Sequence, residues 1–120
     1  MNAFAAALKE IAKRLPEADA VLVMGADGIP VEKLLIRGAM PFDAVAAEIA
    51  GLLRSRAAGT DDTGLGGLRE MAIACRGLTV VASSITPEYF VMALIGAGVA
   101  IGRARFVLRV ASLKMEQEFS

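Results

Sequence analysis

The sequence predicts an α+β fold in which helices cover both faces of a five-stranded antiparallel sheet. Three observations predict it. Apolar residues recur at helical spacing in three segments, an Asp-Gly turn joins two strand-like runs, and three further apolar runs are separated by gaps of only two residues. The expected element order is helix, two strands, helix, three strands, helix, within one domain that spans residues 1–120.

Three segments show helical periodicity. The first, residues 3–15, ends before Pro16 and has an apolar face of Phe4, Leu8, Ile11 and Leu15. The second, residues 42–57, has an apolar stripe of Phe42, Val45, Ile49, Leu52 and Leu53. The third starts near Gly98 and has an apolar stripe of Val99, Phe106, Val110 and Leu113. Gly51 in the second helix costs about 1 kcal/mol relative to alanine, which close approach of another backbone would compensate.

Five short segments read as strands. Asp27-Gly28 joins residues 18–25 to a return strand at 29–37, where Pro30 indicates a strand start or an edge. The remaining strands are expected at residues 68–75, 78–85 and 88–95. The last two are apolar at nearly every position, which indicates that both faces of the sheet are covered there. A single sheet requires strand one beside strand five, so the expected strand order is 2-1-5-4-3.

Composition excludes several classes of function. Lysine and arginine number 13, as do aspartate and glutamate, so no basic excess indicates nucleic acid or an anionic membrane. The most apolar stretch, residues 89–102, is shorter than the roughly 20 residues of a spanning helix, and no secretory signal is read at the N-terminus. Hydrophobic residues make up 56% of the chain, a first indication of an oligomer.

The inventory of chemically active residues is small. There is no histidine and one cysteine, which removes the commonest general base and the commonest metal ligand. We therefore expect no enzyme activity, no metal and no cofactor. Cys75 is expected to be a buried small hydrophobic residue of a strand, with an intermolecular disulfide as the alternative. The arginines of the last helix are expected to form a solvated face, with a basic contact site as the alternative; they are Arg103, Arg105 and Arg109.

Isolated motifs resemble chemical sites but lack the residues that would complete them. Residues 64–67, Gly-Leu-Gly-Gly, lack the Lys-Ser/Thr ending of a phosphate loop and precede a strand, so a flexible loop is expected. Asp61 and Asp62 have no third carboxylate at loop-ligand spacing, so we expect solvated charges. Ser83 and Ser84 have no histidine to activate them and are expected to be ordinary strand residues.

Four segments in order carry a resemblance that covers nearly the whole chain. They are VLVMGADGIPVE at 21–32, LGGLREMAIACRGLTVVAS at 65–83, EYFVMALIGAGVAIGRARFVLRVA at 88–111 and KMEQEF at 114–119. Together they resemble the Roadblock family, which includes roadblock-type dynein light chains and MglB-like regulators of GTPases. The resemblance implies a profilin-like Roadblock fold, with one helix on one face of the sheet and two on the other.

The resemblance also implies a homodimer or a heterodimer. Family members join two sheets through the third strand, here residues 68–75, and place the second helices, here residues 42–57, side by side. The expected dimer-interface residues are Ala47, Gly51, Arg69, Met71 and Ile73. Such a dimer would explain Gly51 and would cover an edge strand that otherwise invites aggregation.

The implied function is cytoplasmic, non-enzymatic binding of a small Ras-like GTPase, with an effect on its nucleotide state or localisation. The expected GTPase-binding surface on the second helix comprises Ala44, Glu48, Arg54 and Ser55. Arg54 and Arg56 are candidates for an arginine finger by location alone, and we expect neither to act as one. The alternative is a scaffold of the dynein-light-chain type, with no role in GTPase regulation.

Overall fold

The computed structural model describes residues 3–57 and 64–119, without the side chains of 54–57 and 119. The element order is that predicted. The elements are α1 (Ala3–Arg14), β1 (Ala18–Gly25), β2 (Pro30–Leu35), α2 (Phe42–Ala57), β3 (Glu70–Ala74), β4 (Leu78–Thr86), β5 (Tyr89–Gly96) and α3 (Gly102–Phe119). The predicted bounds agree within a few residues, except that the third helix starts four residues later than the expected Gly98.

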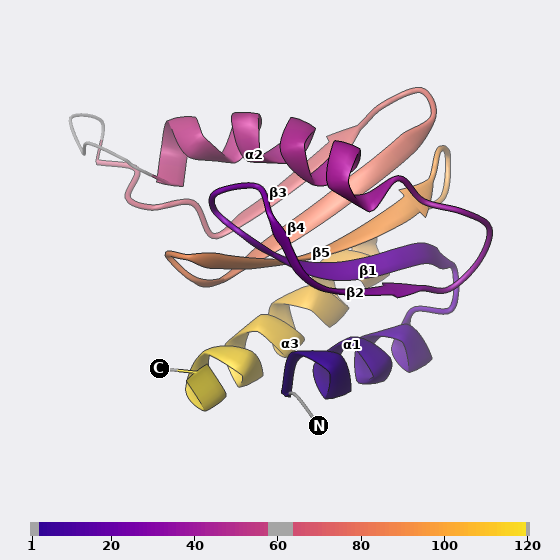
Figure 1. Ribbon diagram of the computed structural model, residues 1–120, viewed down its shortest axis with the longest axis horizontal. Coiled ribbons are helices and arrows are strands. Elements are labelled where there is room, and N and C mark those ends of the chain that lie inside the picture. The colour runs from indigo at the N-terminus through magenta and orange to yellow at the C-terminus, as the bar shows by residue number, and fades with distance from the viewer. Residues whose placement is uncertain (1–2, 58–63, 120) are drawn as a thin grey trace.

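All five strands form one antiparallel sheet in the order β2-β1-β5-β4-β3, which confirms the predicted order (Figure 1). The apolar strand β5 lies in the centre and is buried at every position from Phe90 to Ile95. Strands β2 and β3 are the two edges, and Pro30 begins β2, as its missing N–H requires. The sheet therefore has two open edges that differ in sequence.

The helices form separate layers on the two faces of the sheet. In Figure 1, α2 lies above the sheet, and α1 and α3 lie together below it. Successive side chains of β1 point to opposite faces of the sheet and so belong to two cores. Val21 and Val23 pack toward α1 and α3, whereas Leu22 and Met24 pack toward α2. This arrangement confirms the expected division of one helix and two helices.

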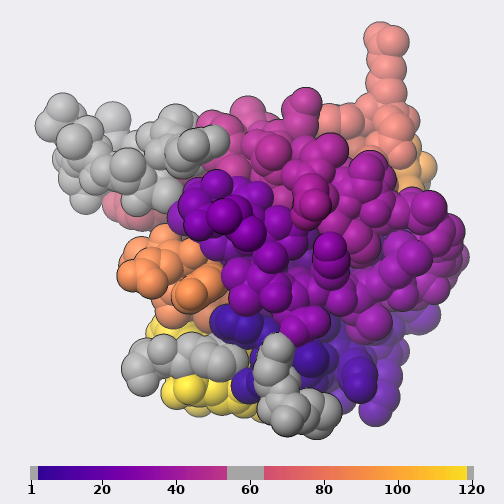
Figure 2. Space-filling view, viewed as in Figure 1, coloured from indigo at the N-terminus to yellow at the C-terminus, as the bar shows by residue number. Residues whose placement is uncertain are grey.

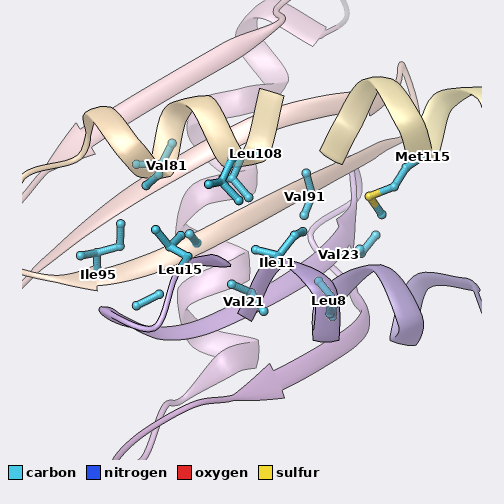
Figure 3. Close-up of a cluster of buried hydrophobic side chains, with 14 of the residues drawn as sticks. Leu8, Ile11, Leu15, Val21, Val23, Val81, Val91, Ile95, Leu108 and Met115 are labelled. Atoms are coloured by element: carbon cyan, nitrogen blue, oxygen red, sulfur yellow. The ribbon is translucent and has the colours of Figure 1, made fainter. Parts of the chain in front are cut away.

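The core between the sheet and the helix pair α1 and α3 is the larger of the two apolar clusters. Figure 3 shows side chains from both helices pointing toward the strands of the sheet. Its labelled members are Leu8, Ile11, Leu15, Val21, Val23, Val81, Val91, Ile95, Leu108 and Met115. All ten are at most 2% exposed, so this layer fixes α3 firmly against β4 and β5.

The β1–β2 turn packs directly against α2. Asp27 Oδ1 accepts a hydrogen bond from the N–H of Ile29 at 3.1 Å, and Gly28 has a φ of +90°. A Cβ atom on Gly28 would lie 2.9 Å from the Cβ of Ala50 in α2. Glycine is therefore required at position 28 for both its backbone conformation and its close contact with the helix.

The apolar stripe predicted for the last helix is not the stripe that the fold buries. Val99 precedes α3, and the other three residues are exposed: Phe106 by 63%, Val110 by 41% and Leu113 by 47%. The buried face of α3 comprises Ala104, Val107, Leu108, Ser112 and Met115. The helix is therefore rotated relative to the predicted stripe, and Phe106, Val110 and Leu113 lie on its outward face.

Candidate protein-binding surface at β3 and α2

The edge strand β3 pairs with β4 on one side only, and its outer side is open. The N–H of Cys75 donates to Leu78 O at 3.0 Å, and the N–H of Ser84 donates to Arg69 O at 2.8 Å. Because backbone groups of an antiparallel strand point alternately to its two sides, odd-numbered residues of β3 face β4. The alternate residues face the open edge, and they are Glu70, Ala72 and Ala74.

The side chains of β3 alternate between the two layers. Met71 and Ile73 are partly buried against the α2-side core, whereas Ala72 and Ala74 are exposed on the other face. Arg69 is exposed and immediately precedes β3. Three of the predicted interface residues, Arg69, Met71 and Ile73, therefore lie at or beside one open edge, and small alanines offer little steric hindrance to an approaching strand.

The predicted residues of α2 share its outward side. Ala44, Ala47, Glu48 and Gly51 are all exposed. A Cβ atom on Gly51 would meet nothing within 4 Å, so no backbone within the described residues explains this glycine. Arg54, Ser55 and Arg56 have helical backbones, but their side chains lie outside the described residues.

One residue of the predicted α2 stripe was assigned to the wrong side. Leu52 is 52% exposed, whereas Ala46 and Ala50 are fully buried in the core beneath α2. The small side chains let the helix lie close to the sheet, and this shifts the buried arc away from Leu52. The outward side of α2 therefore presents a large apolar residue next to Gly51.

An ion-pair cluster ties the start of β3 to α3. Arg109 donates two hydrogen bonds to the Glu70 carboxylate, from Nε at 2.6 Å and from Nη2 at 3.0 Å. Arg105 Nη2 lies 3.6 Å from Glu70 Oε1. The hydrogen bond from Arg109 and the positive charges of Arg109 and Arg105 lower the pKa of Glu70. The same hydrogen bond and the negative charge of Glu70 raise the pKa of Arg109. All three arginines are exposed, as expected of a solvated face, and two of them also form ion pairs with the edge strand.

The third arginine of this group, Arg103, joins the two helices beneath the sheet. Its Nε and Nη2 donate to the carbonyl oxygen of Arg14 at 3.0 and 2.7 Å, and its Nε lies 3.8 Å from Glu17 Oε2. It therefore caps a carbonyl at the C-terminal end of α1. All three arginines are thus exposed charges that also contact other elements, and these contacts could not be read from sequence spacing.

The serines weighed as nucleophiles have structural hydrogen bonds. Ser83 is buried, and its Oγ lies 2.9 Å from the Oγ of Ser112 on α3. Ser84 Oγ donates to the carbonyl oxygen of Thr86 at 3.1 Å. The Ser83 hydroxyl thus joins β4 to α3, and the Ser84 hydroxyl bonds within β4, as expected of ordinary strand residues.

The prediction that Cys75 is buried is wrong. The residue follows β3 and is exposed, because the strand ends at Ala74 before the Arg76-Gly77 turn.

Asp61 and Asp62 lie outside the described residues, whereas Leu65 is described and is 73% exposed. Across residues 3–57 and 64–119, no group of three or more histidine, cysteine or acidic residues is placed to hold a metal ion. In the same ranges, no helix is long and apolar enough to cross a bilayer.

Two clefts lie on the α1 and α3 side of the sheet. One, of about 430 Å³, runs between α1 and α3 and has alanines of α1 on one wall and Val107, Val110 and Ala111 on the other. The second, of about 380 Å³, lies between β3 and α3 and is lined by Arg69, Glu70, Ser83, Arg109 and Leu113 among others. The second cleft adjoins the open β3 edge.

Comparison with protein-family models and with curated proteins finds no match for this sequence. Solved structures do match. MglB, the gliding protein of Thermus thermophilus, superposes with a TM-score of 0.80 at 15% identity over 100% of this chain and 95% of that chain. Another MglB structure, described as having a tetrameric arrangement, also has a TM-score of 0.80, at 13% identity over 98% of this chain and 90% of that chain.

Two further solved structures superpose on this chain. A Roadblock/LC7 domain from Streptomyces avermitilis has a TM-score of 0.76 at 16% identity, over 96% of both chains. Profilin IA of Acanthamoeba castellanii has a TM-score of 0.67 at 12% identity, over 98% of this chain and 100% of that chain. The chain therefore has the profilin-like fold of Roadblock/LC7 domains and MglB.

Proposed function

We propose that this chain is a non-enzymatic, cytoplasmic regulator or adaptor that forms a homodimer through β3 and α2 and binds a small Ras-like GTPase. In this proposal residues 1–120 act as one Roadblock-type domain. The observation that carries it is the combination of an open β3 edge with the uncompensated Gly51 on α2. Both features are costly in an isolated chain, and one dimer would account for both.

The pairing follows from the backbone of β3. A two-fold axis at Ala72 sets Ala72 opposite its own copy and Glu70 opposite Ala74, so that all three outward-facing residues are paired. The side chains on the α3 side of this seam are then small at both central positions. On the α2 side, Met71 and Ile73 of the two copies extend one apolar floor beneath both α2 helices.

The helix pairing follows from the same axis. Both α2 helices lie on the same face of the joined sheet, where Ala47 and Gly51 allow their backbones to approach closely. Leu52, exposed by 52%, gains an apolar neighbour at this seam. Arg69, at the start of the β3 edge, lies beside the same seam.

The GTPase docks in this proposal on the outward side of the paired α2 helices, at Ala44, Glu48, Arg54 and Ser55. A binding protein shifts the nucleotide state of a GTPase only by its differential affinity for the two states. It then alters hydrolysis or exchange without a catalytic residue of its own, so neither Arg54 nor Arg56 is required as an arginine finger. Exposure of Ala44 and Glu48 supports this surface.

Binding to a small GTPase from the same source tests the proposal. We expect the chain to bind that GTPase more tightly in one nucleotide state than in the other, measured by calorimetry with a GTP analogue and with GDP. Glu48→Arg should weaken this binding, whereas Glu118→Arg at the far end of α3 makes the same charge change on the opposite face and should not. Equal affinity for both states would favour the scaffold alternative, and absence of binding would contradict the GTPase proposal.

A further inference from the structure

The second open edge of the sheet, β2, has its own set of unpaired backbone groups. The N–H of Ile36 donates to Asp19 O at 2.8 Å, so position 36 faces β1. By the alternation of an antiparallel ladder, positions 32 and 34 also face β1. The residues whose N–H and C=O groups face outward by this alternation are Lys33 and Leu35. Val31 precedes them at a β-bulge, where the register shifts so that Met24 pairs with Pro30. This edge does not take part in the proposed dimer, so the inference is independent of it.

Lys33 and Leu35 have their side chains on the α2 face of the sheet, because their partners Leu22 and Ala20 belong to the α2-side core. Val31 is the next exposed residue toward the start of the strand, and the three residues together are called the β2 row. Val31 is 46% exposed and Leu35 is 44% exposed. In Figure 2 the purple atoms of the β2 region occupy the viewed surface below α2. The β2 row therefore reads apolar, basic, apolar along an open edge.

Lys33 is held in place without a carboxylate partner. Its Nζ lies 5.6 Å from the centre of the Phe42 ring at the start of α2, a cation–π contact. In the part of the chain that the structure describes, no carboxylate forms an ion pair with Lys33. The ammonium group is thus exposed, positioned and available to an acidic group that approaches along β2.

The row is not complementary to itself. Two copies paired antiparallel through β2 would bring two Lys33 ammonium groups onto one face of the new ladder. The row of Val31, Lys33 and Leu35 contains no carboxylate to neutralise them. Like charges on neighbouring strands are destabilising, and lysine on an edge strand discourages pairing between copies. A second copy of this chain is therefore a poor occupant of β2.

We propose that the outer edge of β2 binds an extended segment of another protein by strand addition. This segment carries an acidic residue opposite Lys33 and apolar residues two positions away on each side, opposite Val31 and Leu35. Backbone hydrogen bonds supply the affinity, and the β2 row supplies the specificity. Lys33 thus disfavours pairing with a second copy of this chain and favours pairing with an acidic strand of another protein.

The test uses the 15N-labelled full chain and two synthetic peptides with blocked ends. One has the sequence Ser-Thr-Val-Thr-Glu-Thr-Val-Thr-Ser, and the other has lysine in place of glutamate. We expect the glutamate peptide to bind more tightly and to shift the amide resonances of Val31, Lys33 and Leu35. The substitution Lys33→Glu should weaken binding of the glutamate peptide by about tenfold and strengthen binding of the lysine peptide.

The control variant is Lys114→Glu, which makes the same charge change on α3, on the other face of the sheet. It should leave both affinities as in the wild type. An unchanged amide spectrum outside β2 shows that Lys33→Glu is folded. The proposal is overturned if neither peptide binds at millimolar concentration, if Lys33→Glu does not reverse the preference, or if the shifted amides lie on another edge or face.

Discussion

Glu70 on the edge strand β3 and Arg109 on α3 are joined by two parallel hydrogen bonds, of 2.6 and 3.0 Å, across 39 positions of sequence. The planar guanidinium matches the carboxylate in a fixed geometry, so the pair sets both position and orientation. Glu70 is also one of the three residues whose backbone faces the open edge. The pair therefore couples the placement of the proposed dimer strand to the helix layer beneath the sheet.

This pair predicts a pH dependence. Because the folded-state pKa of Glu70 is lowered, its contribution to stability is fully present above the unfolded-state pKa of about 4.3. It is lost as the pH falls through the lower folded-state pKa. We expect the difference in unfolding free energy between the wild type and Glu70→Gln to be largest at neutral pH and to vanish in acid. Urea unfolding at pH 7 and at pH 3 measures it, and a difference that grows in acid would contradict the assignment.

The two faces of α3 should respond differently to truncation. Leu108→Ala removes a fully buried side chain and should lower the unfolding free energy by about 2–5 kcal/mol. Phe106→Ala, two residues away in the same helix, removes a larger side chain that is 63% exposed, and its effect should be much smaller. Urea unfolding compares them, and a larger loss for Phe106→Ala would mean that a partner covers the outward face.

The substitution Gly51→Ala should raise the stability of the isolated chain and lower the affinity of the dimer. A Cβ atom meets nothing within 4 Å, so the helix gains up to about 1 kcal/mol. The same methyl group would obstruct a close approach of two α2 helices. We therefore expect a higher melting temperature for the isolated chain and a weaker dimer, seen as a higher dissociation constant in sedimentation. A dimer strengthened by Gly51→Ala would exclude Gly51 from the interface.

Substitution of Gly28 tests the contact between the β1–β2 turn and α2. Gly28→Ala forces a side chain into a φ of +90° and against the Cβ of Ala50, so it should destabilise the chain by about 1–2 kcal/mol or more. Gly38→Ala is the control, because Gly38 has a φ of +69° but open space around it. Thermal unfolding should rank Gly28→Ala as the more damaging change.

Local sequence signals predicted the topology well. Helices and strands begin or end where the sequence signals predicted it, at Pro16, at the Asp27-Gly28 turn and at Pro30. A single sheet required strand one beside strand five, and the uninterrupted apolar run of β5 agrees with the central position that this order gives it. These features depend on residues within a few positions of one another, which is why sequence alone contains them.

Features that depend on distant residues were missed. The face of α3 that is buried depends on how the helix is rotated against β4 and β5, and no periodicity within α3 reveals that rotation. The Glu70–Arg109 pair joins two elements that only the fold brings together. The β2 row was visible in the sequence as Val31, Lys33 and Leu35, but its significance required knowing which strand stays open. Exposure of Cys75 depended on a strand that ends one residue early.

The central claim is that two copies pair through the outer edge of β3, and light scattering of the wild type and of Ala72→Pro tests it most directly. Proline at position 72 removes an N–H that faces away from β4, so the β3–β4 ladder within the chain keeps its hydrogen bonds. We predict a wild-type particle of twice the mass of one chain, and a folded Ala72→Pro particle of one chain. A monomeric wild type, or an Ala72→Pro variant that dimerises as tightly as the wild type, would contradict the account.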